Sequence, residues 1–144
     1  MKKITGKIIA LLTLLLTFAV FVFTGFFSGE TKAVERYFDA IDRQDQTAFD
    51  KYSEKTANVD FIREDYIKKS GLTDSDDVDF KVEFPSGATI KQGGDNFAVP
   101  IKLTVYDDDT HFIFEHAVAN VTYIGNKWRV FSIETNAVET NAGE

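Results

Sequence analysis

The chain contains two histidines, which are the first side chains to consider for metal or acid–base chemistry. His111 and His116 lie five residues apart in one predicted strand. Because side chains alternate between the two faces of a strand, this odd spacing directs the imidazoles to opposite faces unless a bulge intervenes. Neither histidine has a partner at metal-ligand spacing. We therefore expect no zinc or iron site, with His111 solvated beside a turn and His116 at a rim or in the core.

Two runs of aspartate are the other candidates for a cation site. Asp74, Asp76, Asp77 and Asp79 crowd one predicted loop, and residues 107–109 form a second run. A calcium-binding loop usually supplies a glycine for its sharp turn and a closing glutamate, and the first run has neither. The second run fits an ordinary hairpin turn. We predict that both are solvated turns, with no metal and no cofactor.

The sequence lacks the residues that several other chemistries require. It has no cysteine, which excludes disulfides, thiolate metal sites and cysteine nucleophiles, and we expect no lipid-modified N-terminal cysteine. Gly93 and Gly94 fall in a predicted hairpin and do not precede a helix, so they do not form a phosphate-binding loop. No serine has a histidine at a spacing that suggests an activated nucleophile.

The apolar stretch at residues 8–27 determines the expected topology. Its twenty residues carry no charge, and as a helix they span about 30 Å, the thickness of a bilayer core. Lys2, Lys3 and Lys7 precede it, and Glu30 is the first charge after it. We expect a cytoplasmic N-terminus and a single-pass anchor. Two alternatives stay open: removal as a signal peptide, and burial inside a soluble fold.

The remainder of the chain is long enough for one domain with its own core and is strongly acidic. Three of the 16 basic residues and none of the 23 acidic residues precede residue 30, so the remaining 115 residues carry a formal charge of −10. Such a domain repels phosphate backbones and anionic lipid headgroups, and we expect no nucleic-acid binding. We divide the chain into residues 1–29, a cytoplasmic stub and anchor; residues 30–134, an extracytoplasmic domain; and residues 135–144, a flexible tail.

Three helices are predicted at residues 31–44, 46–54 and 60–70. The first has one apolar stripe and one charged face. Asp45 fits an N-cap of the second helix, and Gly71 fits a C-terminal cap of the third. The inward positions predicted for the second and third helices are Phe49, Tyr52, Phe61, Ile62, Tyr66 and Ile67.

From residue 78 onward the apolar period changes from 3.6 to 2, which is typical of strands. Strands are predicted at residues 78–84, 88–91, 97–105, 111–124 and 127–133. Pro100 suggests an edge or a bulge, and an apolar phase change predicts a bulge between about His116 and Asn120. Gly125 and Asn126 close the last hairpin. Helices followed by hairpin-joined strands predict an α+β domain with helices on one face of a bent antiparallel sheet.

Two segments resemble the nuclear transport factor 2-like (NTF2-like) superfamily, whose cystatin-like cone is a curved sheet closed by helices. The opening is AVERYFDAI at residues 33–41, a polar step DRQD at residues 42–45 and AFDKY at residues 48–52. The closing hairpin is YIGNKWRV at residues 123–130. With the anchor, the chain also resembles small bacterial envelope proteins and, at the level of fold, the bitopic inner-membrane component of type IV secretion and conjugation machines.

The resemblance implies where a site would lie. Enzymes with this fold place a carboxylate base and a tyrosine or aspartate donor inside the cone. The residues that could supply such a set are Tyr37, Asp39, Tyr52, Tyr66, Glu115 and His116. No matched acid–base pair emerges among them, so we expect no enzyme. A cone that admitted an apolar ligand would be lined by Tyr37, Phe112, Phe114, His116 and Trp128.

The expected function is that of a non-catalytic, membrane-anchored, extracytoplasmic module in protein interaction or scaffolding at the cell envelope. Its expected partners are the membrane, through residues 8–27, and another envelope protein or a second copy of the chain. One alternative is a bitopic component of a type IV secretion or conjugation machine. The other is a binder of a small apolar ligand, or an enzyme, that uses the cone cavity.

Overall fold

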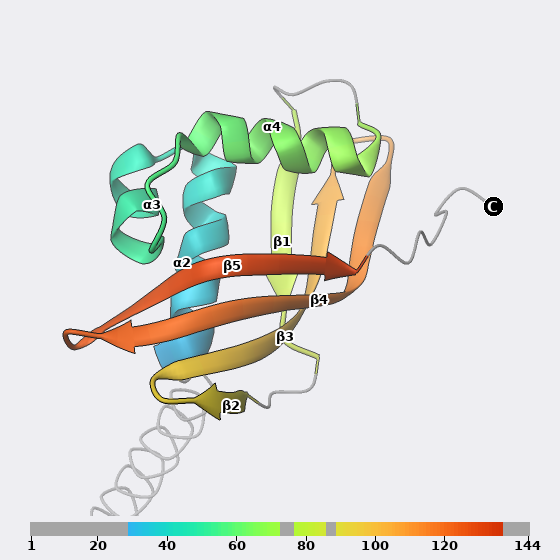
Figure 1. Cartoon of the computed structure of the whole chain (residues 1–144). Helices are drawn as coiled ribbons and strands as arrows, with labels where there is room; N and C mark the ends of the chain where they lie inside the picture. Colours follow the sequence, from blue (N-terminus) through green and yellow to red (C-terminus); the bar gives the residue numbers. More distant parts are fainter. Residues whose placement is uncertain (1–28, 73–76, 86–88, 137–144) are drawn as a thin grey trace, which may run out of the picture.

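Figure 1 shows the computed structural model, which describes residues 29–72, 77–85 and 89–136. Its elements are α2 (Gly29–Arg43), α3 (Gln46–Tyr52), α4 (Val59–Ser70), β1 (Asp79–Glu83), β2 (Ile90–Gly93), β3 (Asn96–Tyr106), β4 (His111–Ile124) and β5 (Lys127–Asn136). The predicted anchor at residues 8–27 lies outside the described residues, as do Asp74, Asp76 and residues 137–144. No helix among the described residues is both long and apolar enough to cross a bilayer.

The helix ends follow the predicted capping. The Asp45 Oδ1 atom accepts a hydrogen bond from the Ala48 N–H at 3.1 Å and so caps α3. The Asn58 side chain accepts from the Asp60 N–H at 2.9 Å at the start of α4. Gly71 ends α4 with a φ of 76°, a left-handed conformation that favours glycine. These contacts satisfy terminal backbone groups that the helices cannot pair themselves.

The strands form one antiparallel sheet in the order β1-β3-β4-β5. β2 pairs with another part of β3, on the same side of β3 as β1. β2 pairs with β3 as far as Ala98, and β1 pairs with it from Lys102 onward. Pro100 lies between these two stretches, where β3 has a strand partner on one side only among the described residues. The sequence prediction of an edge at Pro100 is therefore confirmed.

Two bulges bend the long strands. Ile101 pairs with Ala117 but Leu103 pairs with Phe114, so the register shifts at Glu115 and His116 in β4, at the N-terminal end of the predicted interval. The shift moves the inward phase of β4 from Phe114 to Ala117, which are both buried. A second shift lies in β5. Asn120 pairs with Ser132 but Val121 pairs with Val130, so Phe131 is the extra residue. Figure 1 shows the consequence: β3 and β4 bend so that the sheet curls around α2, with α4 across one end.

The core lies between α2 and the concave face of this sheet. α2 contributes the fully buried Val34, Phe38 and Ile41, and the sheet contributes Leu103 and Val121. The helix and sheet are also joined by a hydrogen bond, because the Asp42 Oδ1 atom accepts from the Phe80 N–H at 2.9 Å. The predicted α+β arrangement of helices on a strongly bent antiparallel sheet is confirmed.

The inward face predicted for α4 is partly wrong. Phe61 is 70% exposed, whereas Arg63 is only 5% exposed. The helix packs through Val59, Arg63, Tyr66 and Ile67, which repeat at i, i+4, i+7 and i+8. Arg63 is tolerated in this face because its Nη2 atom donates a hydrogen bond of 2.6 Å to the Val78 carbonyl oxygen and its guanidinium lies 5.8 Å from the centre of the Phe80 ring.

The last strand is longer than predicted. β5 extends to Asn136, where Thr135 and Asn136 pair with Ala117 and His116 of β4. The ordered domain therefore passes the predicted boundary at residue 134. Sequence periodicity missed these residues because Glu134, Thr135 and Asn136 are all polar and continue no apolar alternation after Ile133.

Candidate functional site

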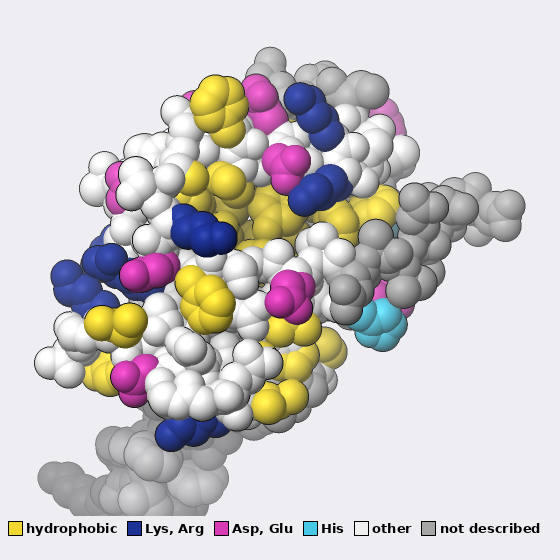
Figure 2. Space-filling view, in the orientation of Figure 1, with side chains coloured by type: hydrophobic (Ala, Val, Ile, Leu, Met, Phe, Trp, Pro, Cys, Tyr) yellow, Lys and Arg dark blue, Asp and Glu magenta, His cyan; other side chains and the backbone are white. Residues whose placement is uncertain are grey.

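The first candidate site is a hollow of about 240 Å³ between α4 and β5, which we call the α4–β5 hollow. It is lined by Tyr37, Phe49, Ser53, Lys55, Ala57, Ile62, Asp65, Tyr66, Lys69 and the β5 residues Val130, Phe131, Ser132 and Ile133. In Figure 2, hydrophobic side chains form the floor of this region, with Lys or Arg and Asp or Glu side chains around it. The hollow is where the curled sheet and the helices leave a gap in the core.

Two tyrosines bring hydroxyl groups to this hollow. Tyr37 is 8% exposed and Tyr66 is 6% exposed, and neither phenol oxygen makes a hydrogen bond within the described residues. Burial raises the pKa of Tyr37 to about 12, and burial with the neighbouring Tyr37 raises the pKa of Tyr66 still further. Both phenols are protonated at neutral pH, as an unperturbed tyrosine also is, and burial moves their ionisation further from it. Each can donate a hydrogen bond to an oxygen or nitrogen atom that enters the hollow.

Three carboxylates of α2 and α4, of which only Asp65 lines the hollow, are engaged in other contacts. Asp65 is exposed at the rim and forms an ion pair of 2.9 Å with Lys69. Asp39 faces solvent and pairs with Arg43 at 3.3 Å. Asp42 accepts the backbone hydrogen bond described above. Of the residues considered for an acid–base set, the structure brings only Tyr37 and Tyr66 together.

The remaining members of that set lie elsewhere. Glu115 and His116 are both exposed, because the bulge in β4 turns the two adjacent side chains to the outside. Tyr52 lies at the end of α3, in a different depression from the one that Tyr66 lines. His111 is exposed at the start of β4, beside the turn at Asp107.

Within the described residues, neither of the two depressions in this subsection is lined by all of the residues predicted to line a cavity. Tyr37 lines the α4–β5 hollow. Phe112 and Phe114 contact each other edge to face at 4.7 Å between ring centres, and Phe114 is 3% exposed in the core. His116 is exposed on the bulge. Trp128 lies in a separate depression beside the β4–β5 hairpin.

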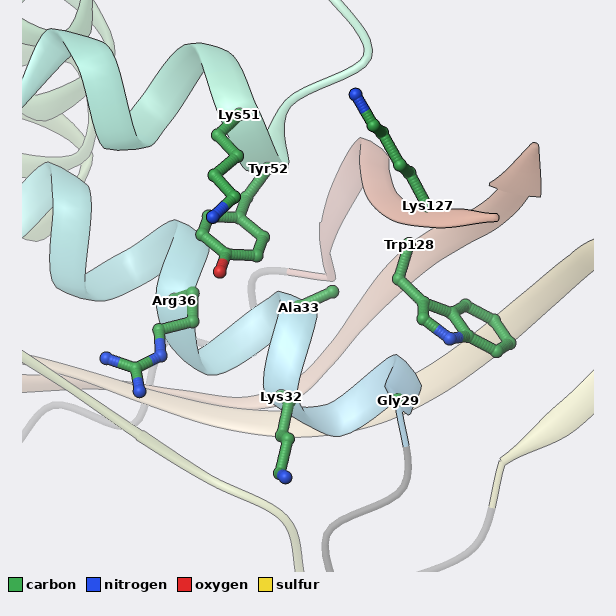
Figure 3. A pocket seen from close by; sticks show the side chains of 8 residues that line it. All are labelled: Gly29, Lys32, Ala33, Arg36, Lys51, Tyr52, Lys127 and Trp128. Carbon is green, nitrogen blue, oxygen red and sulfur yellow. The ribbon is translucent and has the colours of Figure 1, made fainter. Parts of the chain in front are cut away.

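The second candidate site is this depression, which we call the Trp128 cleft. It has a volume of about 370 Å³ and is lined by Gly29, Lys32, Ala33 and Arg36 of α2, Lys51 and Tyr52 of α3, and Lys127 and Trp128 of β5. Figure 3 shows the indole beside Gly29, Lys51 lying along Tyr52, and Lys127 pointing away from the indole. Three elements that are distant in the sequence therefore meet around one aromatic side chain.

Two aromatic rings and the backbone of Gly29 contact the partly buried indole. Its ring centre lies 5.2 Å from that of Phe97 and 4.6 Å from that of Tyr123. A Cβ atom at Gly29 would lie 2.2 Å from the indole Nε1 atom, so only glycine permits this approach of α2. The position of Trp128 thus depends on the first residue of α2 as well as on the hairpin.

The charges of the Trp128 cleft are all positive. Lys32, Arg36, Lys51 and Lys127 line it, and its lining includes no carboxylate. Within the described residues, none of these four side chains forms an ion pair. Sequence analysis missed this cleft. The available signal was the spacing of Gly29, Lys32 and Arg36 at i, i+3 and i+7, which places them on one helix face.

Metal sites were not expected from the sequence. Across the part of the chain that the structure describes, no three His, Cys, Asp or Glu side chains are grouped so that they could hold a metal ion. The Asp107 Oδ1 atom instead accepts from the N–H groups of Asp109 at 2.9 Å and Thr110 at 2.7 Å. The aspartate run at residues 107–109 is therefore a turn, as predicted.

Comparison with known proteins gives similarity to solved structures alone. No family model and no curated protein matches the chain. A Nostoc punctiforme protein of unknown function with a cystatin-like fold is 13% identical, with 73% of this chain and 85% of that chain covered and a TM-score of 0.47. A second Nostoc punctiforme domain of unknown function with a cystatin-like fold is 10% identical, with coverage of 71% and 70% and a TM-score of 0.47. An NTF-2 like protein of unknown function from Shewanella oneidensis is 12% identical, with coverage of 71% and 91% and a TM-score of 0.42.

Proposed function

We propose that the chain is a non-catalytic binding module, anchored in a membrane by residues 8–27, whose extracytoplasmic domain binds another envelope protein. The observation that carries the proposal is the outer edge of β5 beside the α4–β5 hollow. On that side, the backbone contacts of β5 with another strand or loop in the described residues are the Ser53–Val130 bridge and a 2.8 Å hydrogen bond from the Glu54 N–H to the Val130 carbonyl. An ion pair of 3.8 Å between Arg129 and Glu54 adds a side-chain contact.

An edge strand next to a hollow suits an extended segment of a partner protein. The outward N–H and C=O groups of an edge strand can pair with an added strand. Phe131, Ser132 and Ile133 lie on this edge and also line the hollow. A segment that paired with them would place one apolar side chain over the hydrophobic floor, beside the hydroxyl groups of Tyr37 and Tyr66.

The chemistry of the hollow supports binding in preference to catalysis. Its two buried titratable groups are phenols, which are protonated at neutral pH like any tyrosine, and burial raises their pKa values further from it. General acid–base catalysis needs a group whose pKa lies near the working pH. The carboxylate at the rim, Asp65, is exposed and paired with Lys69. Hydrogen-bond donors on an apolar floor are suited to recognising a polar group of a partner.

A photo-crosslinking experiment on the full chain in intact membranes tests this proposal. A photoreactive amino acid replaces Lys55, an exposed residue that lines the hollow, and in a matched control it replaces Lys91, an exposed residue of β2. We expect one adduct of defined mass with the first variant and none with the second. Free monomer from both variants, or the same adducts from both, would overturn the proposal. An ATPase or channel component in the adduct would support the narrower role in a secretion or conjugation machine.

The anchor is tested separately. We expect the full chain to stay with membranes after carbonate extraction, and a reporter enzyme fused after residue 144 to be active only outside the cytoplasm. Release of the chain into the soluble fraction, or a reporter that is active only in the cytosol, would remove the anchored topology from the proposal and leave the binding surface to be judged by the crosslinks.

A second candidate function is the binding of a small apolar ligand, which the hydrophobic floor of the α4–β5 hollow favours. Native mass spectrometry of the full chain in mild detergent would then show a bound compound. The variant Ile62→Trp, which fills the hollow, should lose that compound, whereas Phe61→Trp on the exposed face of α4 should keep it. A chain without any bound mass would count against this function.

A further inference from the structure

The Trp128 cleft concentrates positive charge on a domain that is acidic as a whole. Four cations line it and no carboxylate does, although the chain after residue 29 has a formal charge of −10. Because charges are screened over about 10 Å at 0.1 M salt, a ligand in the cleft meets these four cations at shorter range than the net charge of the whole domain. Figure 2 shows Lys and Arg side chains between α3 and the end of the β4–β5 hairpin, with an Asp or Glu side chain beside them.

The position of the cleft in the chain limits its distance from the proposed anchor. Gly29 is the first residue of α2 and follows residue 27, the last residue of the apolar stretch, by two positions. Two residues span at most about 7 Å. Arg36 lies seven residues further along α2, which is about 10 Å of helix. The cleft therefore lies next to the membrane surface if residues 8–27 span the bilayer.

The side chains of the cleft suit the headgroup region of a membrane. Tryptophan and tyrosine favour this region because each has an apolar ring and a polar group. The ammonium and guanidinium groups of Lys32, Arg36 and Lys51 can donate charge-assisted hydrogen bonds to phosphate oxygens. Lysine and arginine stems also pack against apolar chains while the charged group stays in water.

We propose that the Trp128 cleft binds the phosphate group of an anionic phospholipid on the outer surface of the membrane, and thereby holds the domain against the bilayer in one orientation. The inference rests on the anchored topology of the proposed function. The net charge of the sequence predicts that anionic headgroups repel the acidic domain. That repulsion acts on the domain as a whole, whereas the charged side chains that line the cleft are all cations. The α4–β5 hollow lies at a different part of the domain and is lined by other residues.

Intrinsic fluorescence tests the proposal directly, because Trp128 is the single tryptophan of the sequence. The full chain is reconstituted into vesicles of phosphatidylcholine alone or with up to 30% phosphatidylglycerol. Acrylamide quenching of the indole is then measured at low salt and at 0.5 M salt. We expect quenching to decrease as phosphatidylglycerol increases at low salt, and this protection to weaken at high salt.

The variants follow from the expected contribution of each charge. One lysine or arginine near an anionic surface contributes about 1 kcal/mol, or about a fivefold change in affinity. The double variant Lys32→Gln, Arg36→Gln should therefore lower the affinity for phosphatidylglycerol about 25-fold and abolish the protection of Trp128. The control Lys68→Gln, Lys81→Gln removes two exposed cations that lie outside the cleft and should behave as wild type.

The outcomes separate this inference from the proposed function. A chain that stays in both kinds of vesicle with identical quenching would overturn the inference and leave the anchor in place. A chain retained by neither would overturn the anchor, and the inference with it. Protection by soluble glycerol phosphate in phosphatidylcholine vesicles would show that the cleft takes a free phosphate ester and not a lipid. If the control variant lost protection to the same extent, the effect would depend on the net charge of the domain, and the cleft would not be the binding site.

Discussion

Asp42 joins the first described helix to the first strand, because its Oδ1 atom accepts a hydrogen bond from the Phe80 N–H at 2.9 Å. Burial raises the pKa of this carboxyl group, the hydrogen bond opposes the shift, and the nearby Asp79 reinforces it. The net direction is upward, so the fold favours the protonated form. At neutral pH, a neutral hydrogen-bond acceptor at position 42 should therefore stabilise the folded state at least as well as the charged carboxylate does.

Two substitutions separate the hydrogen bond from the charge. Asp42→Asn keeps an oxygen acceptor and removes the charge, whereas Asp42→Ala removes both. Loss of the acceptor leaves a backbone N–H unpaired, at a cost of about 1–3 kcal/mol in the free energy of unfolding, and alanine regains about 0.5 kcal/mol in helix propensity. We expect Asp42→Ala to be destabilised by about 1–2 kcal/mol at pH 7. We expect Asp42→Asn to be as stable as wild type or more stable.

The pH dependence has a defined sign. Protonation of Asp42 stabilises the wild-type fold fully below the unfolded pKa of about 3.9, and this contribution is lost as the pH rises through the higher folded pKa. The advantage of Asp42→Asn should therefore be larger at pH 7 than at pH 4. Urea unfolding of the full chain in non-ionic detergent, followed by tryptophan emission, measures it. A greater loss of stability in Asp42→Asn at pH 7 than at pH 4 would show that the fold favours the ionised carboxylate, and would refute this reasoning.

Three further predictions concern other parts of the domain. Gly29→Ala places a Cβ atom 2.2 Å from the indole nitrogen, so we expect a loss of about 1–3 kcal/mol and a shift in tryptophan emission; unchanged emission would contradict the contact. Tyr66→Ala should cost about 3–5 kcal/mol in urea unfolding, whereas Phe61→Ala, at a side chain 70% exposed, should cost less than about 0.5 kcal/mol, and equal losses would refute the burial pattern of α4. The hydrogen bonds from the N–H groups of Thr110 and Asp109 lower the pKa of Asp107, so the turn should loosen as the pH falls through that lowered value. Lower protection of the Thr110 amide from hydrogen exchange below pH 4 would confirm this prediction, and constant protection would contradict it.

Local signals in the sequence predicted most of the fold. Asp45 and Gly71 marked helix ends because capping depends on the residue type at a single position. The change of apolar phase in β4 revealed its bulge because an extra residue must reverse the alternation. These features are decided by neighbours in the chain, so the chain alone was sufficient to predict them.

Features that depend on distant contacts were not predictable in the same way. The inward position of Arg63 depends on the Val78 carbonyl and the Phe80 ring, which lie beyond the end of α4. Without those partners, a helix wheel assigns the inward position to an apolar residue such as Phe61. The prediction was based on residue type alone, whereas the contacts with Val78 and Phe80 determine that Arg63 is buried and Phe61 is exposed.

The candidate sites show the same division. The aromatic residues expected to line one cone are separated, because Phe114 fills the core while Trp128 lies at the hairpin. Net charge hid the cationic Trp128 cleft, since a sum over the whole domain contains no information about where the charges meet. Three separate segments form that cleft, and only the fold brings Lys32, Lys51 and Lys127 to one depression.

The contact between Gly29 and Trp128 also has a consequence for biosynthesis. It joins the first described residue to one that is made about 100 residues later. At roughly 5–20 residues per second, α2 leaves the ribosome about 5–20 s before the indole that packs on it. β1, which also packs on α2, is made within that interval, so the apolar side of α2 is covered in steps and its contact with the C-terminal hairpin forms last.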